Sequence, residues 1–435
     1  RMPPMKSLAP LLSIIALVVG LVGCPGGGGD GGGGGSSSTA FLYVSNSGGS
    51  DISAYSVDTT TGALAPLAGS PFPAEADPQA MTLNASGSVA FVSNAGSASV
   101  SGYLLNAGTG LLTPASVIAF PAGTIPQTLT LEPFEKFAFV ANAGAHTVSV
   151  YSVNPTTGVL TAVAGSPFLV APGTQPQRAT VVTVSPTVQF VYLANAGSND
   201  VSGFFLNTST GFLNPAPGSP FAVGATPQSV VADSAGNFVY IANAGAASIS
   251  AFGVNQTDGA LSFPVAGAPF SAGTTPQPVT LHPTKPFAYV ANAGSSNLSA
   301  YSVDASTGEF MIITNLGPPV TNFFSAGTTP QQVTIDPTGK FAVVANAGSD
   351  NVSVYEINQI TGRLGQVAGS PFAAGTLPRR VTVDPTGKFV FVPNSGSNSV
   401  SAYQFNSTTG FLTPVPGSPF AAGTGPQFIR AIGAF

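Results

Sequence analysis

Four arginines are the residues of this sequence whose positions suggest binding chemistry. Arg178, Arg379, Arg380 and Arg430 each closely follow a proline that begins a strand of a repeated unit. A guanidinium presents a rigid fork of N–H donors that matches a carboxylate or a phosphate. Because equivalent strands of a repeat protein start at one mouth, we expect the arginines to converge there and bind an anionic small molecule. The alternative is that they solvate the mouth or pair with local acids.

Glutamine follows the same proline in most copies of the repeat. The series comprises Gln79, Gln127, Gln177, Gln228, Gln277, Gln331 and Gln427. We expect these amides to surround the mouth, with the asparagines of the repeat outside them, and we include Gln127, Gln228 and Gln331 among the candidate ligand-binding residues. The alternative is that the amides satisfy the backbone of turns, as short polar side chains often do.

The other titratable residues indicate no catalytic or metal site. With Cys24 as the only cysteine, and His146 and His282 as the only histidines, the usual zinc ligand sets are excluded. We expect Asp336 and Asp384 to cap turns, and His282 to be a surface residue of an equivalent turn. His146, beside a turn at the mouth, has no neighbouring acid that would make it a general base. We therefore predict no metal, no cofactor and no assignable catalytic residue.

A repeated segment of the form FxYVANAG determines the architecture that must position these residues. Its asparagine recurs at Asn46, Asn94, Asn142, Asn195, Asn243, Asn292, Asn346 and Asn394. The period of roughly 50 residues is typical of β-propellers, and each repeat contains four strand patterns separated by Pro-, Gly- and Asp-containing turns.

The composition also favours an all-β protein, because the chain has 53 Gly, 39 Pro and only 6% charged residues. The Pro-Gln strand is missing before Phe41, but an additional one follows the eighth repeat, from Pro426 to Phe435. We predict an eight-bladed propeller of four-stranded antiparallel blades, closed by this C-terminal strand so that no sheet edge is left open. A seven-bladed ring is the alternative if one repeat is degenerate.

The charge balance argues against nucleic-acid binding. The formal net charge is −5, the calculated pI is about 4.8, and no cluster of basic residues is present that would neutralise a phosphate backbone.

The N-terminal residues have the pattern of an export signal. A basic start is followed by an apolar stretch and by Leu21 to Cys24, which resembles the lipobox of bacterial lipoproteins. The resemblance implies a signal peptide over residues 1–23, lipid attachment at Cys24 and a Gly/Ser-rich tether over residues 24–40. The propeller would then span residues 41–435. We expect the protein to be anchored to a membrane in the cell envelope, outside the cytoplasm, at the outer membrane or the cell surface.

The FxYVANAG segments resemble the YVTN repeat, and the whole body resembles the lactonase propeller family that includes 6-phosphogluconolactonase. Enzymatic members of that family carry histidines in PHxH motifs near the start of inner strands. The corresponding positions here read Pro126-Gln127-Thr128, Pro227-Gln228-Ser229 and Pro330-Gln331-Gln332. No catalytic residue can therefore be transferred, and the family is usually seven-bladed.

Two functions remain open at this point. The first is a lipid-anchored binding or scaffold protein that uses the propeller mouth to hold an anionic small molecule, a carbohydrate or a protein partner. The second is a lactone hydrolase of the 6-phosphogluconolactonase type, a carboxylic ester hydrolase. The missing histidines favour the first function, and the family resemblance favours the second.

Overall fold

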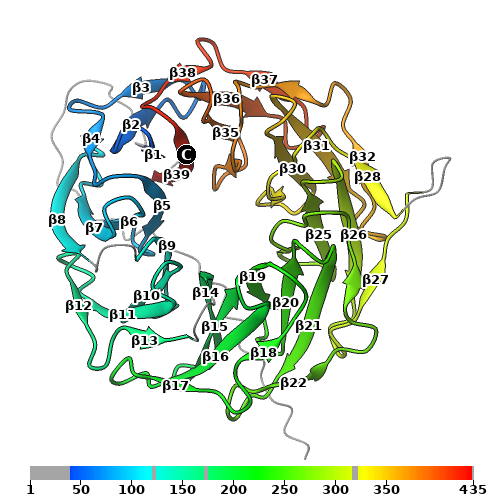
Figure 1. The fold of residues 1–435 in the computed structure, drawn as a ribbon. Coiled ribbons are helices and arrows are strands. Elements are labelled where there is room, and N and C mark those ends of the chain that lie inside the picture. Colours follow the sequence, from blue (N-terminus) through cyan, green and yellow to red (C-terminus); the bar gives the residue numbers. More distant parts are fainter. Residues whose placement is uncertain (1–39, 120–123, 171–174, 316–321, 434–435) are drawn as a thin grey trace, which may run out of the picture. The chain divides into compact units, whose positions relative to one another are not determined.

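The computed structural model describes residues 40–119, 124–170, 175–315 and 322–433. Cys24, the predicted signal peptide and nearly all of the predicted tether lie outside these ranges. The described residues form strands and turns without a helix, and the strands assemble into eight antiparallel sheets. These sheets follow one another around a ring in chain order (Figure 1). The expected eight-bladed propeller is confirmed. We number the blades 1 to 8 by the chain order of their second strands.

Each blade has an inner strand at the ring axis, which pairs with a second strand. The inner strands, from blade 1 to blade 8, are β39 (Pro426–Gly433), β5 (Pro78–Leu83), β9 (Pro126–Leu131), β14 (Pro176–Ser185), β19 (Pro227–Ala232), β24 (Thr280–Leu281), β29 (Thr334–Ile335) and β34 (Thr382–Val383). The second strands are β1 (Ala40–Asn46), β6 (Val89–Asn94), β10 (Phe137–Asn142), β15 (Val188–Asn195), β20 (Phe238–Asn243), β25 (Phe287–Asn292), β30 (Phe341–Asn346) and β35 (Phe389–Asn394).

The third strand of each blade pairs with an outer strand that is broken in two pieces, except in blade 2. The third strands are β2 (Asp51–Val57), β7 (Ser99–Leu105), β11 (Thr147–Val153), β16 (Asp200–Leu206), β21 (Ser248–Val254), β26 (Asn297–Val303), β31 (Asn351–Ile357) and β36 (Ser399–Phe405). The outer strands are β3 (Leu64–Pro66) with β4 (Phe72–Pro73), β8 (Leu112–Ala119), β12 (Leu160–Ala162) with β13 (Phe168–Leu169), β17 (Leu213–Pro215) with β18 (Phe221–Ala222), β22 (Leu261–Pro264) with β23 (Phe270–Ser271), β27 (Phe310–Ile312) with β28 (Phe323–Ser325), β32 (Leu364–Gln366) with β33 (Phe372–Ala373), and β37 (Leu412–Pro414) with β38 (Phe420–Ala421).

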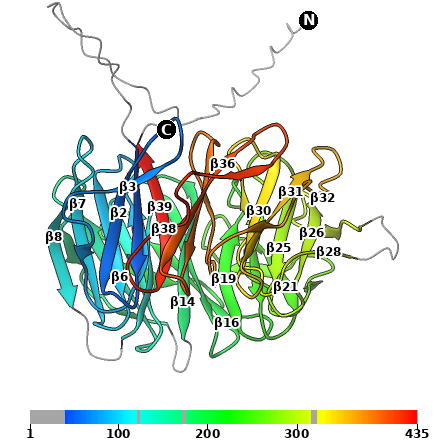
Figure 2. The same cartoon turned by 90° about the horizontal axis from the view of Figure 1, so that it is seen from above.

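The last strand of the chain completes the first blade. Strand β39 pairs antiparallel with β1 from Ala40 opposite Gly433 to Asn46 opposite Pro426. Figure 2 shows the red β39 beside the blue strands of blade 1. The predicted closure by the C-terminal strand is confirmed, and it leaves the inner edge of blade 1 paired.

The second strands are apolar on both faces because a neighbouring sheet covers each face. In β10 all six residues are buried, and Phe139 and Val140 are 0% exposed. The core is therefore a series of layers between blades. A glycine in each turn between the third and outer strands lets neighbouring blades pack closely against each other. Gly308, for example, has φ +75°, and a Cβ there would lie 2.4 Å from the ring of Phe238 on the preceding blade.

The asparagine that ends each second strand is a structural residue. All eight of these side chains are buried, at 0 to 1% exposure. Each one donates from Nδ2 to a serine of the third strand, as in the 2.8 Å bond from Asn346 to Ser353 Oγ. The expectation that these amides face the mouth is wrong, because the asparagines turn into the sheet instead.

Threonine hydroxyls on the inner strands bond one blade to the next. In six blades the threonine four residues after the inner-strand proline donates to a main-chain carbonyl of the following blade, at 2.5 to 3.2 Å. We call this series the threonine belt, with bonds from Thr82 to Leu129, Thr130 to Ala179, Thr180 to Val230, Thr280 to Val333, Thr334 to Val381 and Thr382 to Ile429. Arg430 in blade 1 and Val231 in blade 5 occupy the corresponding positions.

The threonine belt predicts the effect of an isosteric substitution. Thr130→Val keeps the shape of the side chain but removes the bond to the Ala179 carbonyl, so we expect the free energy of unfolding to fall by about 1 kcal/mol in urea titrations. The matched control is Thr128→Val on the same strand, because no hydroxyl bond to another blade is present there. Equal losses in the two variants would contradict a role for the belt in joining the blades.

Candidate functional site

The second residue after each inner-strand proline faces the ring axis. We call these eight sites the channel positions, and they are Ala80, Thr128, Arg178, Ser229, Pro278, Gln332, Arg380 and Phe428. All eight line one or other of two cavities. The repeat explains the pattern, because these are equivalent positions of equivalent inner strands around one ring.

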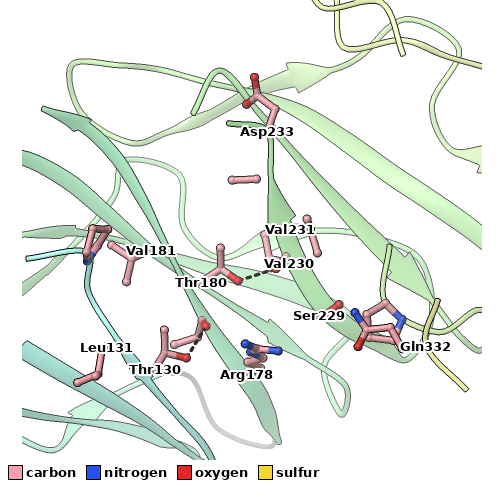
Figure 3. A pocket seen from close by; sticks show the side chains of 14 residues that line it. Thr130, Leu131, Arg178, Thr180, Val181, Ser229, Val230, Val231, Asp233 and Gln332 are labelled. Carbon is pink, nitrogen blue, oxygen red and sulfur yellow. Dashed lines mark hydrogen bonds between the residues drawn. The ribbon is translucent and has the colours of Figure 1, made fainter. Parts of the chain in front are cut away.

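The two cavities adjoin each other along blades 3 and 4. One measures about 390 Å³ and the other about 430 Å³, and Thr130, Leu131 and Arg178 line both. Figure 3 shows Arg178, Ser229 and Gln332 around the first cavity, together with belt bonds from Thr130 and Thr180. We call the second cavity the arginine cavity, because Arg178, Arg380 and Arg430 all line it.

Three of the four predicted arginines are thus brought together. Arg178 and Arg380 occupy the same channel position on blades 4 and 8, which are opposite blades in a ring of eight. Arg430 lies on blade 1, at the position of a belt threonine. The cavity they share is lined by no aspartate, glutamate or histidine among the described residues.

The surroundings of these guanidinium groups disfavour their charge. Enclosure by the channel walls, followed by the nearby charges of Arg178 and Arg430, lowers the pKa of Arg380 to about 10. Enclosure and the charge of Arg178 likewise lower the pKa of Arg430 to about 10. Enclosure also lowers the pKa of Arg178, although part of this side chain is exposed to solvent. The cavity therefore carries positive charge that an anion would neutralise.

Phe428 orients two of the arginines. The Arg430 Cζ atom lies 4.4 Å from the centre of the Phe428 ring, and the Arg380 Cζ atom lies 5.9 Å from it. Both distances are in the range of cation–π contacts. Sequence reasoning missed Phe428, but its channel position, shared with Arg178 and Arg380, was a readable signal.

Arg379 does not join the other three. Its side chain bonds to Ser395 of its own blade, with Nε 2.9 Å from Oγ, and it lines neither cavity. Arg379 stands in blade 8 where the other blades carry a glutamine directly after the proline. The bond to Ser395 holds the Arg379 side chain against its own blade, whereas Arg380 lines the arginine cavity.

The predicted glutamines serve their own loops to a large extent. Gln127 Nε2 donates to the Ile125 carbonyl at 3.4 Å, and Gln331 Nε2 donates to the Thr329 carbonyl at 3.2 Å. Gln79 and Gln127 also line the arginine cavity, whereas Gln228 and Gln331 line neither cavity. Gln79 and Gln127 thus share the cavity with the three arginines.

Both histidines have structural partners. The Gln175 backbone N–H donates to His146 Nδ1 at 3.3 Å, which fixes the loop before an inner-strand proline. His282 is only 6% exposed, so its expected surface position is wrong. It caps its turn as Asp336 and Asp384 cap theirs, with Nδ1 accepting from the Lys285 backbone at 3.0 Å. Its Nε2 is 2.7 Å from the Gly339 carbonyl of the next blade.

The described ranges contain no group of three or more His, Cys, Asp or Glu side chains arranged to hold a metal ion. The same ranges contain no helix that is long and apolar enough to cross a bilayer.

Comparison with known proteins places the fold in a described family. A family model for a lactonase with a seven-bladed β-propeller matches residues 35–124, 112–275 and 263–425. No curated protein sequence matches the chain.

Solved structures resemble the chain over most of its length. A Bacteroides fragilis protein proposed to be a 6-phosphogluconolactonase is 18% identical with a TM-score of 0.58, covering 91% of this chain and 98% of its own. The periplasmic gluconolactonase PpgL of Pseudomonas aeruginosa is 17% identical with a TM-score of 0.59, covering 91% and 99%. The dihydro-heme d1 dehydrogenase NirN is 12% identical with a TM-score of 0.61, covering 90% and 74%. Such low identities establish the fold alone.

The clustered arginines predict a gain of stability when one is neutralised. We expect Arg380→Gln to raise the free energy of unfolding by about 1 kcal/mol at low ionic strength, because a partly desolvated charge facing like charges is removed. The matched Arg379→Gln variant should show no gain. The comparison requires urea titrations with chloride as the only anion.

The same charge predicts a pH signature. The pKa of Arg380 is lowered to about 10 from 12.5. The Arg380 charge therefore destabilises the wild-type fold fully below pH 10, and this destabilisation disappears as the pH rises toward 12.5. Added salt should also reduce the difference in the free energy of unfolding between the wild type and Arg380→Gln. If neither salt nor high pH reduces this difference in the free energy of unfolding, the stability gain of Arg380→Gln is not electrostatic.

Proposed function

The chain belongs to the lactonase β-propeller family, and from this premise we propose that it is a binding protein that holds a small carboxylate- or phosphate-bearing molecule in its arginine cavity. The observation that carries the proposal is the convergence of Arg178, Arg380 and Arg430 on one cavity whose described lining contains no acid. A cavity of about 430 Å³ lies in the size range of small-molecule sites.

An anion in this cavity would form ion pairs with the guanidinium groups that line it. Guanidinium forks approach from blades 4, 8 and 1, and the ring of Phe428 restricts the motion of two of them. Preorganised donors lose less conformational freedom on binding, so more of the interaction free energy becomes affinity. Gln79 and Gln127 supply neutral polar groups on the same wall, suited to hydroxyl groups of an acidic sugar.

The proposed setting is the cell envelope. The lipobox resemblance of Leu21 to Cys24 supports a lipid-anchored protein, and the chain composition supports an exported propeller without nucleic-acid partners. A tethered binding protein at a membrane would meet small anionic metabolites outside the cytoplasm.

Lactone hydrolysis is the second candidate, and family membership favours it. The arginines would stabilise the oxyanion that forms when water attacks the lactone carbonyl. Attack also needs a group that removes a proton from the water. Asp233 is the only carboxylate among the described residues that line the two cavities. It shares the first cavity with Arg178, and its Oδ1 already accepts from the Phe238 backbone at 2.8 Å. We therefore rank binding first.

Binding of gluconate and inorganic phosphate to the purified protein tests the proposal. A ligand at 100 times its dissociation constant should stabilise the fold by about 2.7 kcal/mol, which is measurable as a shift of the thermal unfolding midpoint. The Arg380→Gln/Arg430→Gln double variant should bind at least about tenfold more weakly, because charge-assisted hydrogen bonds are lost.

The control is Arg379→Gln, which should bind both anions like the wild type. Equal affinity in the double variant would refute the arginine cavity as the site. Glucono-δ-lactone is the probe for the second candidate. Turnover that is lost in Asp233→Asn but retained in Arg379→Gln would replace binding by lactone hydrolysis as the function.

A further inference from the structure

The boundary between blades 5 and 6, here called the 5–6 seam, differs from the other boundaries. The threonine belt is interrupted there, because Val231 stands where Thr180 and Thr280 stand on the neighbouring blades. A tyrosine hydrogen bond that crosses three of the other boundaries is also absent here among the described residues. A different tyrosine bond, from the Tyr301 hydroxyl to the Ser271 carbonyl at 2.6 Å, still crosses the seam. The 5–6 seam thus lacks two kinds of cross-link and keeps a third.

The absent bond is one that tyrosines of the second strands make in blades 1, 4 and 6, whereas blades 2, 3, 7 and 8 carry Phe or Val at the same position. Tyr43, Tyr192 and Tyr289 each donate from the hydroxyl to the carbonyl of the turn glycine on the next blade, with distances to Gly110, Gly259 and Gly362 of 2.6, 2.7 and 2.9 Å. Tyr240 is the equivalent residue of blade 5. Its hydroxyl is buried and has no hydrogen-bond partner among the described residues.

A single residue accounts for the difference. Two positions after the turn glycine the blades carry leucine, as at Leu112, Leu261 and Leu364, but blade 6 carries Phe310. The Phe310 ring stacks on the Tyr240 ring, with centres 4.4 Å apart and an angle of 23° between the planes. It also stacks on Phe270 and Tyr301. This aromatic stack sets the direction of the Tyr240 ring, and the hydroxyl does not reach the glycine carbonyl.

A pocket of about 530 Å³ is lined in part by Tyr240. Tyr240, Phe238 and Phe287 form its aromatic walls, and Leu281, Pro283 and Val303 add aliphatic surface. The pocket lies beside the turns that begin at Asp233 and His282, which join inner to second strands and therefore lie on the face opposite the buried asparagines. It shares only Ala232 and Asp233 with the lining of the channel cavities.

We propose that this pocket binds a small, uncharged and largely apolar molecule that carries a hydrogen-bond acceptor for the Tyr240 hydroxyl. A buried donor without a partner costs free energy, and a ligand carbonyl or ether oxygen would remove that cost. Apolar walls with one placed polar group are the usual composition of a small-molecule site.

The charges around the pocket favour an uncharged ligand. Asp233 is half-buried in the lining and Lys285 is exposed at its edge. The lining therefore carries charges of both signs, and neither an anionic nor a cationic ligand is favoured. Burial and the Asp233 charge raise the pKa of the Tyr240 hydroxyl. The hydroxyl therefore keeps its proton at neutral pH and acts as a donor.

Acetophenone and ethylbenzene form a matched pair of probes, because they differ in the carbonyl oxygen. We expect the wild-type protein to bind acetophenone about fivefold more tightly than ethylbenzene in ligand-observed NMR titrations. Tyr240→Phe should remove this preference by weakening acetophenone alone. The control is Tyr289→Phe, which removes a hydroxyl from the neighbouring seam and should leave both affinities unchanged.

Stability measurements give an independent readout. Tyr289→Phe breaks an existing bond and should lower the thermal unfolding midpoint, whereas Tyr240→Phe removes an unpaired hydroxyl and should not lower it. Ala305→Trp, at an exposed position of the pocket lining, should weaken both probes.

Three results would overturn the proposal: no binding of either probe, equal binding of both probes to the wild type, or an unchanged preference in Tyr240→Phe. The experiment is separate from the proposed function, because Arg380→Gln/Arg430→Gln should bind acetophenone normally.

Discussion

Hydroxyl-to-carbonyl hydrogen bonds between blades are the interaction on which the rest of this structure depends. The threonine belt joins neighbouring blades near the axis, and tyrosine hydroxyls join them further out. Each bond fixes the distance and rotation of one sheet relative to the next. A channel position can hold a side chain at a defined place only because these relations are repeated around the ring. The opposition of Arg178 and Arg380 across the arginine cavity follows from them.

Both candidate sites lie where the threonine belt is interrupted. Arg430 replaces a belt threonine in blade 1 and contributes its guanidinium to the arginine cavity. Val231 replaces a belt threonine in blade 5, at the seam where Tyr240 also lacks its bond. A binding site needs polar groups that face a cavity and have no partner within the protein. A boundary between blades needs hydrogen-bond partners for its buried polar groups. The belt bond is present at six boundaries, and another side chain replaces the threonine at the other two. The repeats therefore carry stability, and the departures from the repeat carry the candidate functions.

The fold was predictable from the sequence because its signals are repeated. Each repeat shows the turn glycine and the apolar second strand, and the C-terminal strand follows the same pattern as the other inner strands. The site was predictable only in part. Proximity to proline indicated four arginines, but Arg379 bonds to Ser395 of its own blade and does not line the cavity. The hydrogen bond that holds Arg379 depends on Ser395, which is 16 residues away in the sequence. Burial of His282 depends on contact with Gly339, which is remote in sequence.

The number of blades limits what family membership says about chemistry. The matching family model is described as seven-bladed, whereas this chain forms eight sheets. A ring of seven has no pair of opposite blades, so the facing of Arg178 and Arg380 from blades 4 and 8 has no counterpart there. An eighth blade also changes every angle between inner strands, and with it the separation of groups across the channel. An activity can therefore be inferred from a relative with this fold only where the site residues also match. The binding function that we propose therefore rests on Arg178, Arg380 and Arg430 as they are placed here.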